Sequence, residues 1–141
     1  MSADYSRGIE VLKELAIVAG LGLACFMAHG QNSPEWLPLA ESNTDKWEGH
    51  AGTRTRTTTR AGDEVVVAEG RVTNRLAHTI AFEKYYAKVD DCRTGSGKLV
   101  TLDMAGNYKF ETDFVLHGGN VASSLAEMLC YAVSEADKKS L

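Results

Sequence analysis

Residues 80–92 read IAFEKYYAKVDDC and are the long run with the most strand-like composition in the chain. In an extended strand, successive side chains point to opposite faces. Ile80 and Phe82 would therefore share one face, whereas Tyr85 would lie on the other. This change of phase predicts a bulge at Glu83-Lys84, or a strand that is covered on both faces.

The N-terminal region reads as an export signal. Residues 15–28 (LAIVAGLGLACFMA) carry no charge, and this length is short of the ~20 residues of a membrane span but matches a signal-peptide core. Ala28 and Gly30 place small residues at the −3 and −1 positions of a cleavage site before Gln31. We predict that residues 1–30 are a signal peptide and that the protein is periplasmic, secreted or at the cell surface.

Two alternatives for this region stay open. The segment is retained as an anchor, or Cys25 is lipidated, since the small residue Ala24 precedes it as in bacterial lipoprotein signals. The residues ahead of the apolar core are not basic, as a signal peptide normally requires. Translation that begins near position 11 would remove most of them. In either alternative the N-terminal segment is the part of the chain that meets a membrane.

The cysteines predict one disulfide. Cys25 leaves with the signal peptide, so Cys92 and Cys130 remain as an even pair in an oxidising compartment. Cys130 lies in a predicted helix that Asn120 can cap. At 100° per residue, Cys130 falls about 60° beyond the apolar stripe of that helix. We therefore expect the bond to join the helix to the strand of residues 80–92 at the border of their interface.

The remaining chain predicts one small α+β domain. Residues 31–45 are mostly polar and contain both prolines, which indicates a flexible arm that Trp36, Leu37 and Leu39 could dock. Residues 46–137 alternate apolar and polar residues in several runs before the helix, and Trp47 is expected to anchor the first strand in the core. We predict an antiparallel sheet of about four to six strands with the C-terminal helix packed on it, and a tail at residues 138–141.

Residues 53–60 read TRTRTTTR and have no apolar face. Threonine favours strands, and the charges would protect an exposed edge strand or hairpin arm from self-pairing. The alternative is a basic strip of Arg54, Arg56 and Arg60 that meets an acidic partner or a polyanion.

Motifs for catalysis, metal binding and cofactor binding do not occur in the sequence. It has no HExxH, CxxC or GxSxG pattern, and residues 93–98 (RTGSGK) lack the spacing of a phosphate loop. The net charge of −4 argues against nucleic acid as a partner. We expect a binding domain without cofactor or metal rather than an enzyme; a small hydrolase is the least favoured alternative.

The region from Trp47 to Cys130 resembles the surface-adhesin E-like family of bacterial envelope proteins. The resemblance rests on the early tryptophan, the Tyr85-Tyr86 segment that leads to Cys92, a basic turn predicted at residues 93–98, and the C-terminal helix with the second cysteine. TRTRTTTR stands where the family has an aromatic strand. The resemblance implies an exported domain with an antiparallel sheet, a helix packed on it and a cysteine bridge. Because no catalytic motif is present, we expect this domain to act by binding a protein or envelope component. A structural or inhibitor-like, lipid-anchored module is the alternative.

Overall fold

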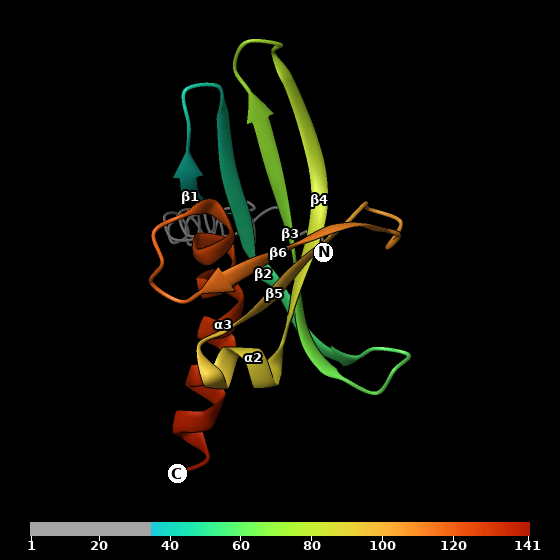
Figure 1. The fold of residues 1–141 in the computed structure, drawn as a ribbon, viewed down its shortest axis with the longest axis vertical. Helices are drawn as coiled ribbons and strands as arrows, with labels where there is room; N and C mark the ends of the chain where they lie inside the picture. Colours follow the sequence, from blue (N-terminus) through green and yellow to red (C-terminus); the bar gives the residue numbers. More distant parts are fainter. Residues whose placement is uncertain (1–34) are drawn as a thin grey trace, which may run out of the picture. The chain divides into compact units, whose positions relative to one another are not determined.

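A computed structural model describes residues 35–141 of the chain, which form a six-stranded antiparallel sheet with one long helix packed on it (Figure 1). The strands are β1 (Trp36–Glu41), β2 (Asp45–Thr58), β3 (Glu64–Asn74), β4 (Thr79–Lys88), β5 (Ser96–Leu102) and β6 (Tyr108–Val115). The helices are α2 (Val89–Thr94) and α3 (Val121–Lys139). The strands lie in the sheet in chain order. The predicted α+β architecture is confirmed.

The core lies between α3 and one face of the sheet. Asn120 caps the helix as predicted, since its Oδ1 accepts the Ser123 N–H at 2.8 Å. An apolar stripe of α3 that includes Leu125 and Leu129 is buried against the sheet. On the sheet this core includes Val66, Ala68, Tyr85, Ala87, Leu99 and Phe114. Alternation along β3 and β4 supplies most of these residues, as the period of a strand requires.

Strand β4 corrects the predicted bulge. Its pairing with β3 runs without a register shift from Thr79 to Lys88. The apolar residues change face because the cover changes: α3 covers Tyr85, whereas Ile80 and Phe82 are on the opposite face and remain 54% and 49% exposed. The apolar side chains of β4 therefore do change face along the strand, but no backbone irregularity causes the change.

The end of the opening run is a helix, which corrects the prediction that it is strand throughout. Strand β4 ends at Lys88, and Cys92 lies on α2. Asp90 and Asp91 lie in the first turn of α2, where the helix dipole favours negative charge. Gly95 ends the helix with φ of 93°, in the left-handed region that glycine adopts without strain. The predicted turn at residues 93–98 is thus the end of α2 and the start of β5.

The predicted flexible arm is in part a strand. Trp36–Glu41 pairs with β2 as β1, and Leu39 packs against the core. Pro38 is tolerated because β1 lies at the edge of the sheet, where a missing N–H need not break a ladder. Helix α3 reaches Lys139, so the predicted tail begins inside it.

The predictions about the export signal at residues 1–30, the start near position 11 and lipidation of Cys25 lie outside the described residues. Within residues 35–141, neither helix combines the length and the apolar character that crossing a bilayer requires.

Candidate functional site

The disulfide between Cys92 and Cys130 is present as predicted, with a Cα–Cα distance of 5.2 Å. It joins α2 to α3 rather than a strand to α3. Both cysteines are nearly buried at the border of the core. One residue after Cys92, Arg93 donates two hydrogen bonds to Asp137 of α3, at 3.1 and 3.0 Å. These bonds hold the pKa of the Asp137 carboxyl below its usual value, so it stays ionised and keeps this second link between the helices.

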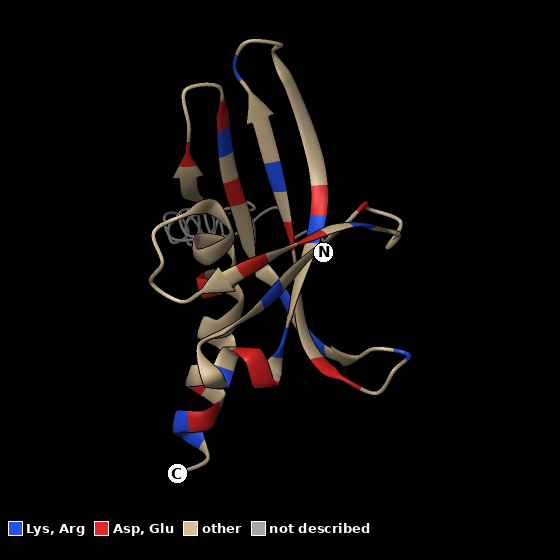
Figure 2. Cartoon of the chain, viewed as in Figure 1, with Lys and Arg blue, Asp and Glu red and all other residues tan. Residues whose placement is uncertain are grey.

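The three arginines of the predicted basic strip have different surroundings. Arg54 Nη1 donates to the carbonyl oxygen of Met128 on α3 at 2.9 Å. Arg56 is paired with Glu64 across the β2–β3 hairpin, with Nη2 2.8 Å from Oε2. Arg60 is exposed in the turn after β2. Figure 2 shows acidic and basic residues interspersed along the strands. Arg54 and Arg56 thus have hydrogen-bond partners within the domain, whereas Arg60 is solvent-exposed, and the binding strip stays a prediction.

The turn of Arg54 toward α3 comes from an irregularity in β2 that the sequence analysis missed. The β2–β3 register shifts between His50 and Thr55. Inside this shift, the Thr53 hydroxyl donates to the His50 carbonyl at 2.7 Å and accepts the Glu69 N–H at 2.9 Å. A hydroxyl thereby satisfies main-chain groups that the shifted ladder leaves unpaired. Gly52, a residue uncommon inside strands, was the available signal in the sequence.

Two hollows flank the outer ridge of α3. The larger has a volume of about 790 Å³ and lies against the disulfide, with Arg93, Leu116, His117 and Val133 in its wall. The smaller, of about 420 Å³, lies between α3 and the β1–β2 edge and includes Leu37, Leu39, Arg54 and Met128. Glu127 and Tyr131 belong to both hollows. We call the two hollows with their shared ridge the Tyr131 site.

Tyr131 is the aromatic side chain shared by the two hollows. It is 55% exposed, although it lies beside residues that are buried in the core. The Arg54 guanidinium carbon is 5.5 Å from the centre of its ring, which is within the range of a cation–π interaction. Glu127 lies one helical turn earlier on the same face. Its carboxylate accepts the His117 N–H at 2.6 Å and so fixes the loop between β6 and α3.

The surface of the Tyr131 site is mostly apolar. Leucine, valine and methionine side chains line it, together with the charged residues Arg54, Arg93, Glu127 and Asp137. This combination favours binding a partner that offers apolar surface and a few polar groups. The arginines are held in place by their own hydrogen bonds, so little side-chain entropy is lost when a partner binds.

A second cluster lies on the sheet face opposite α3. Glu48 of β2 and Arg71 of β3 form an ion pair there, and the Arg71 guanidinium carbon lies 4.4 Å from the centre of the Trp36 ring. The Trp36 ring is also 4.8 Å from that of His50. Hydrogen bonds from Arg71 lower the pKa of Glu48 despite its burial. The sequence analysis did not single out this cluster, because the pairing of β2 with β3 was unknown.

A third group lies around Glu83, in the middle of β4. The Tyr85 hydroxyl donates to Glu83 Oε1 at 2.8 Å, and the Lys109 ammonium binds Oε2. Burial raises the pKa of the Tyr85 hydroxyl, so it remains a hydrogen-bond donor at every physiological pH. These contacts satisfy a carboxylate that would otherwise be costly to bury.

Within the described part of the chain, no three His, Cys, Asp or Glu side chains gather where they could hold a metal ion. Comparisons with protein-family models, with curated proteins and with solved structures found no match for this chain.

Proposed function

We propose that the protein is an exported binding domain of the bacterial envelope that recognises a protein partner at the Tyr131 site. The observation that carries the proposal is the exposure of Tyr131 between two hollows on a helix that is fixed by a disulfide. Tyrosine and arginine are among the residue types that are enriched at the energetic centres of interfaces.

The shape of the site supports a protein partner. A side chain that enters either hollow would be bordered by the Tyr131 ring on one side and by sheet or loop residues on the other. The larger hollow of about 790 Å³ lies within the size range of ligand sites, but both hollows are open to solvent. Such a surface favours a protein segment that lies across the ridge.

The disulfide supports the proposed compartment. Protein disulfides persist in oxidising compartments, such as the periplasm and the cell exterior, and are rare in the cytosol. The resemblance to the surface-adhesin E-like family, whose members are exported, supports the same location. The apolar segment at residues 15–28 would supply the export signal.

Site-specific photo-crosslinking in the native cells tests the proposal. A benzophenone amino acid replaces Tyr131 in one full-length variant and Leu76 in the control. Leu76 is also strongly exposed but lies in the β3–β4 turn. We expect one discrete crosslinked protein from position 131 and none of that mass from position 76. Equal products from both positions, or no product from position 131, would contradict the proposed site.

A second measurement tests the compartment separately. After cell fractionation, the mature protein is expected in the periplasmic, surface or secreted fraction without free thiols. A cytoplasmic protein in which Cys92 and Cys130 are both reactive thiols would refute export, whatever the crosslinking shows.

A further inference from the structure

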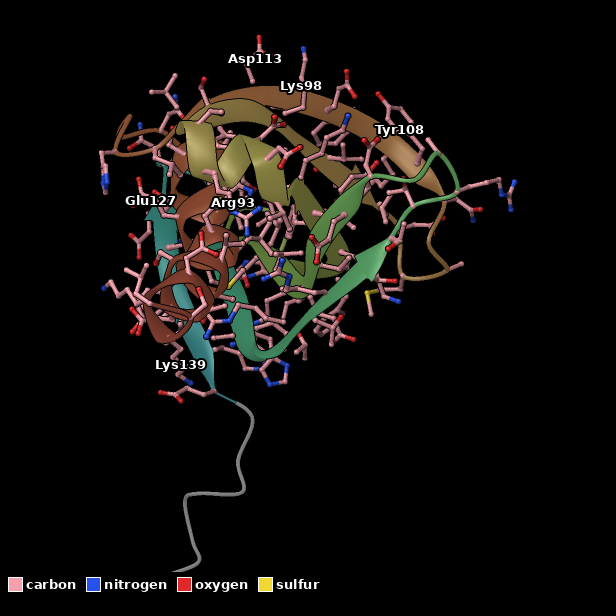
Figure 3. All side chains as sticks on the ribbon, turned by 90° about the horizontal axis from the view of Figure 1, so that it is seen from below. Arg93, Lys98, Tyr108, Asp113, Glu127 and Lys139 are labelled. Carbon is pink, nitrogen blue, oxygen red and sulfur yellow. A yellow bond between two sulfur atoms is a disulfide. The ribbon has the colours of Figure 1, made fainter. Side chains whose placement is uncertain are left out.

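Strand β6 presents a long exposed edge. It pairs with β5 on one side and is the last strand of the sheet. Seven of its eight residues are exposed; the exception is Phe114. An edge strand carries main-chain N–H and C=O groups that can accept a further strand. Figure 3 shows Tyr108, Lys98 and Asp113 along this border of the molecule, away from Arg93 and Glu127 of the Tyr131 site.

The two faces of β6 differ in character. Glu111 and Asp113 are two residues apart and therefore share one face. Lys98 of β5 lies beside both carboxylates, with Nζ 3.9 Å from Glu111 and 2.7 Å from Asp113. One cation thus serves two carboxylates, and Asp113 remains 81% exposed. The other face carries Phe110, an aromatic ring that is about half exposed.

The opposite edge of the sheet is protected against strand addition, whereas the regular part of β6 is not. Strand β1 has only six residues, contains Pro38 and has a register shift next to it. Prolines and bulges prevent another strand from pairing. The irregularity in β6 falls at its beginning, since the β5–β6 register shifts between Thr101 and Leu102. Residues 110–115 therefore form an uninterrupted acceptor.

The charges of β6 argue against a second copy of the chain as the added strand. A two-fold axis at Glu111 would place that carboxylate opposite its own copy, and an axis at Thr112 would place Glu111 opposite Asp113. Like charges in opposite positions destabilise a strand pair. An axis at Phe110 would bring Lys109 opposite Glu111, but Glu83 already binds the Lys109 ammonium. A strand that pairs with this edge should therefore be basic.

We propose that the β6 edge binds an extended basic segment of a partner protein by strand addition. The segment carries lysine or arginine at two alternate positions, opposite Glu111 and Asp113, and apolar residues at the positions that alternate with them, one of which covers Phe110. Main-chain hydrogen bonds to the exposed edge supply affinity, and the alternating side chains supply selectivity. This surface is distinct from the Tyr131 site and goes beyond the function proposed for it.

Binding of a synthetic peptide tests the proposal. The probe is fluorescein-labelled Val-Lys-Val-Lys-Val-Thr, and the comparison peptide has glutamate in place of both lysines. We measure fluorescence anisotropy with the full-length, disulfide-bonded chain at low and high salt. We expect the basic peptide to bind about tenfold more tightly than the acidic one at low salt, and this preference to shrink when salt screens the charges.

Charge reversal locates the site. The double variant E111K/D113K is expected to invert the preference of the two peptides. The matched control D90K/E135K makes the same change of net charge on the two helices and should leave the preference intact. Amide chemical-shift changes on titration of the basic peptide should be confined to β5 and β6, and Tyr131→Ala should not alter them.

The proposal is wrong if the two peptides bind equally, or if D90K/E135K abolishes the preference for the basic peptide as fully as E111K/D113K does. It is also wrong if the amide chemical-shift changes are centred on α3, or if Tyr131→Ala abolishes binding of the basic peptide. Self-association of the chain with protection of the β6 amides from hydrogen exchange would assign this edge to a second copy instead. Because Tyr131→Ala and the β6 variants alter different surfaces, failure of this proposal is distinguishable from failure of the proposed function.

Discussion

Arg71 and Glu48 make a two-point ion pair across β2 and β3, with Nε 3.0 Å from Oε2 and Nη2 3.2 Å from Oε1. Glu48 is only 6% exposed, and its other close cation, Lys46, lies 3.7 Å away. The Trp36 ring covers the guanidinium group of Arg71. This pair holds β1, β2 and β3 together on the face that α3 does not cover.

Removal of Arg71 should destabilise the domain strongly. Arg71→Met leaves a buried carboxylate with little compensation, and we expect a loss of about 3 kcal/mol in the free energy of unfolding. The matched control is Arg75→Met, which breaks the exposed pair with Glu41 and should cost less than about 1 kcal/mol. Urea unfolding at neutral pH measures both, and similar losses in the two variants would contradict the prediction.

The same pair predicts an acid sensitivity. The pKa of Glu48 is lower in the folded chain than its ordinary value of 4.5, so the ionised form stabilises the fold. This stabilisation is present above the ordinary pKa and is lost as the pH falls through the lowered pKa. The stability of the wild type should therefore decrease more steeply below about pH 4.5 than that of Glu48→Gln. Urea midpoints between pH 7 and pH 3 test this, and parallel curves would count against it.

Two strand glycines should respond differently to an added methyl group. At Gly70 a Cβ would lie 2.5 Å from Cε2 of the buried Tyr85 ring and 3.0 Å from the Glu48 carbonyl oxygen. At Gly49 it would contact the flexible end of Met128. We expect Gly70→Ala to cost about 2–3 kcal/mol and Gly49→Ala about 1 kcal/mol.

Gly52→Ala is the control for this pair, because the nearest atom to its Cβ is 3.9 Å away. Thermal unfolding of the three variants ranks their losses of stability. If Gly52→Ala lost as much stability as Gly70→Ala, the loss would come from replacing any glycine in a strand and not from crowding of the added methyl group.

Loss of the disulfide should lower stability by about 3–4 kcal/mol, because the bond closes a loop across a sequence separation of 38 residues in the unfolded chain. The comparison is between wild type and the Cys92→Ser/Cys130→Ser variant in urea, with and without reductant. Reductant should destabilise the wild type and leave the variant unchanged. The prediction fails if the oxidised wild type and the variant unfold at the same urea concentration.

The sequence was sufficient for the architecture, because alternating runs, an apolar helical stripe and an even pair of cysteines are local or countable signals. The sequence was insufficient where contacts with distant elements determine the local structure. Val89 continues the apolar alternation of β4, yet it begins α2, since the chain must turn toward α3 before Gly95. The apparent bulge at Glu83-Lys84 arose from the limited reach of α3 over the sheet.

The candidate site was less predictable than the fold. Arg54 was identified for its charge, but its role depends on the register shift in β2 and on a carbonyl of α3, more than 70 residues away in sequence. Tyr131 occupies a polar position of a helix, and its exposure matters only because there is a hollow on each side of it, one toward the β6–α3 loop and one toward the β1–β2 edge. Neither relationship has a signature in the local sequence.

Each strand of the sheet pairs with the strand that precedes it in the chain, so the hairpins close short loops. Helix α3 is the element that contacts all six strands, and it comes last. During synthesis, the apolar face formed by residues such as Val66 and Phe114 therefore stays uncovered until α3 has emerged. Cys92 also cannot form its disulfide until α3, which carries Cys130, has emerged. A chain arrested before Asn120 would display both an apolar surface and a reactive thiol, which are the features that chaperones and thiol oxidoreductases recognise in unfinished proteins.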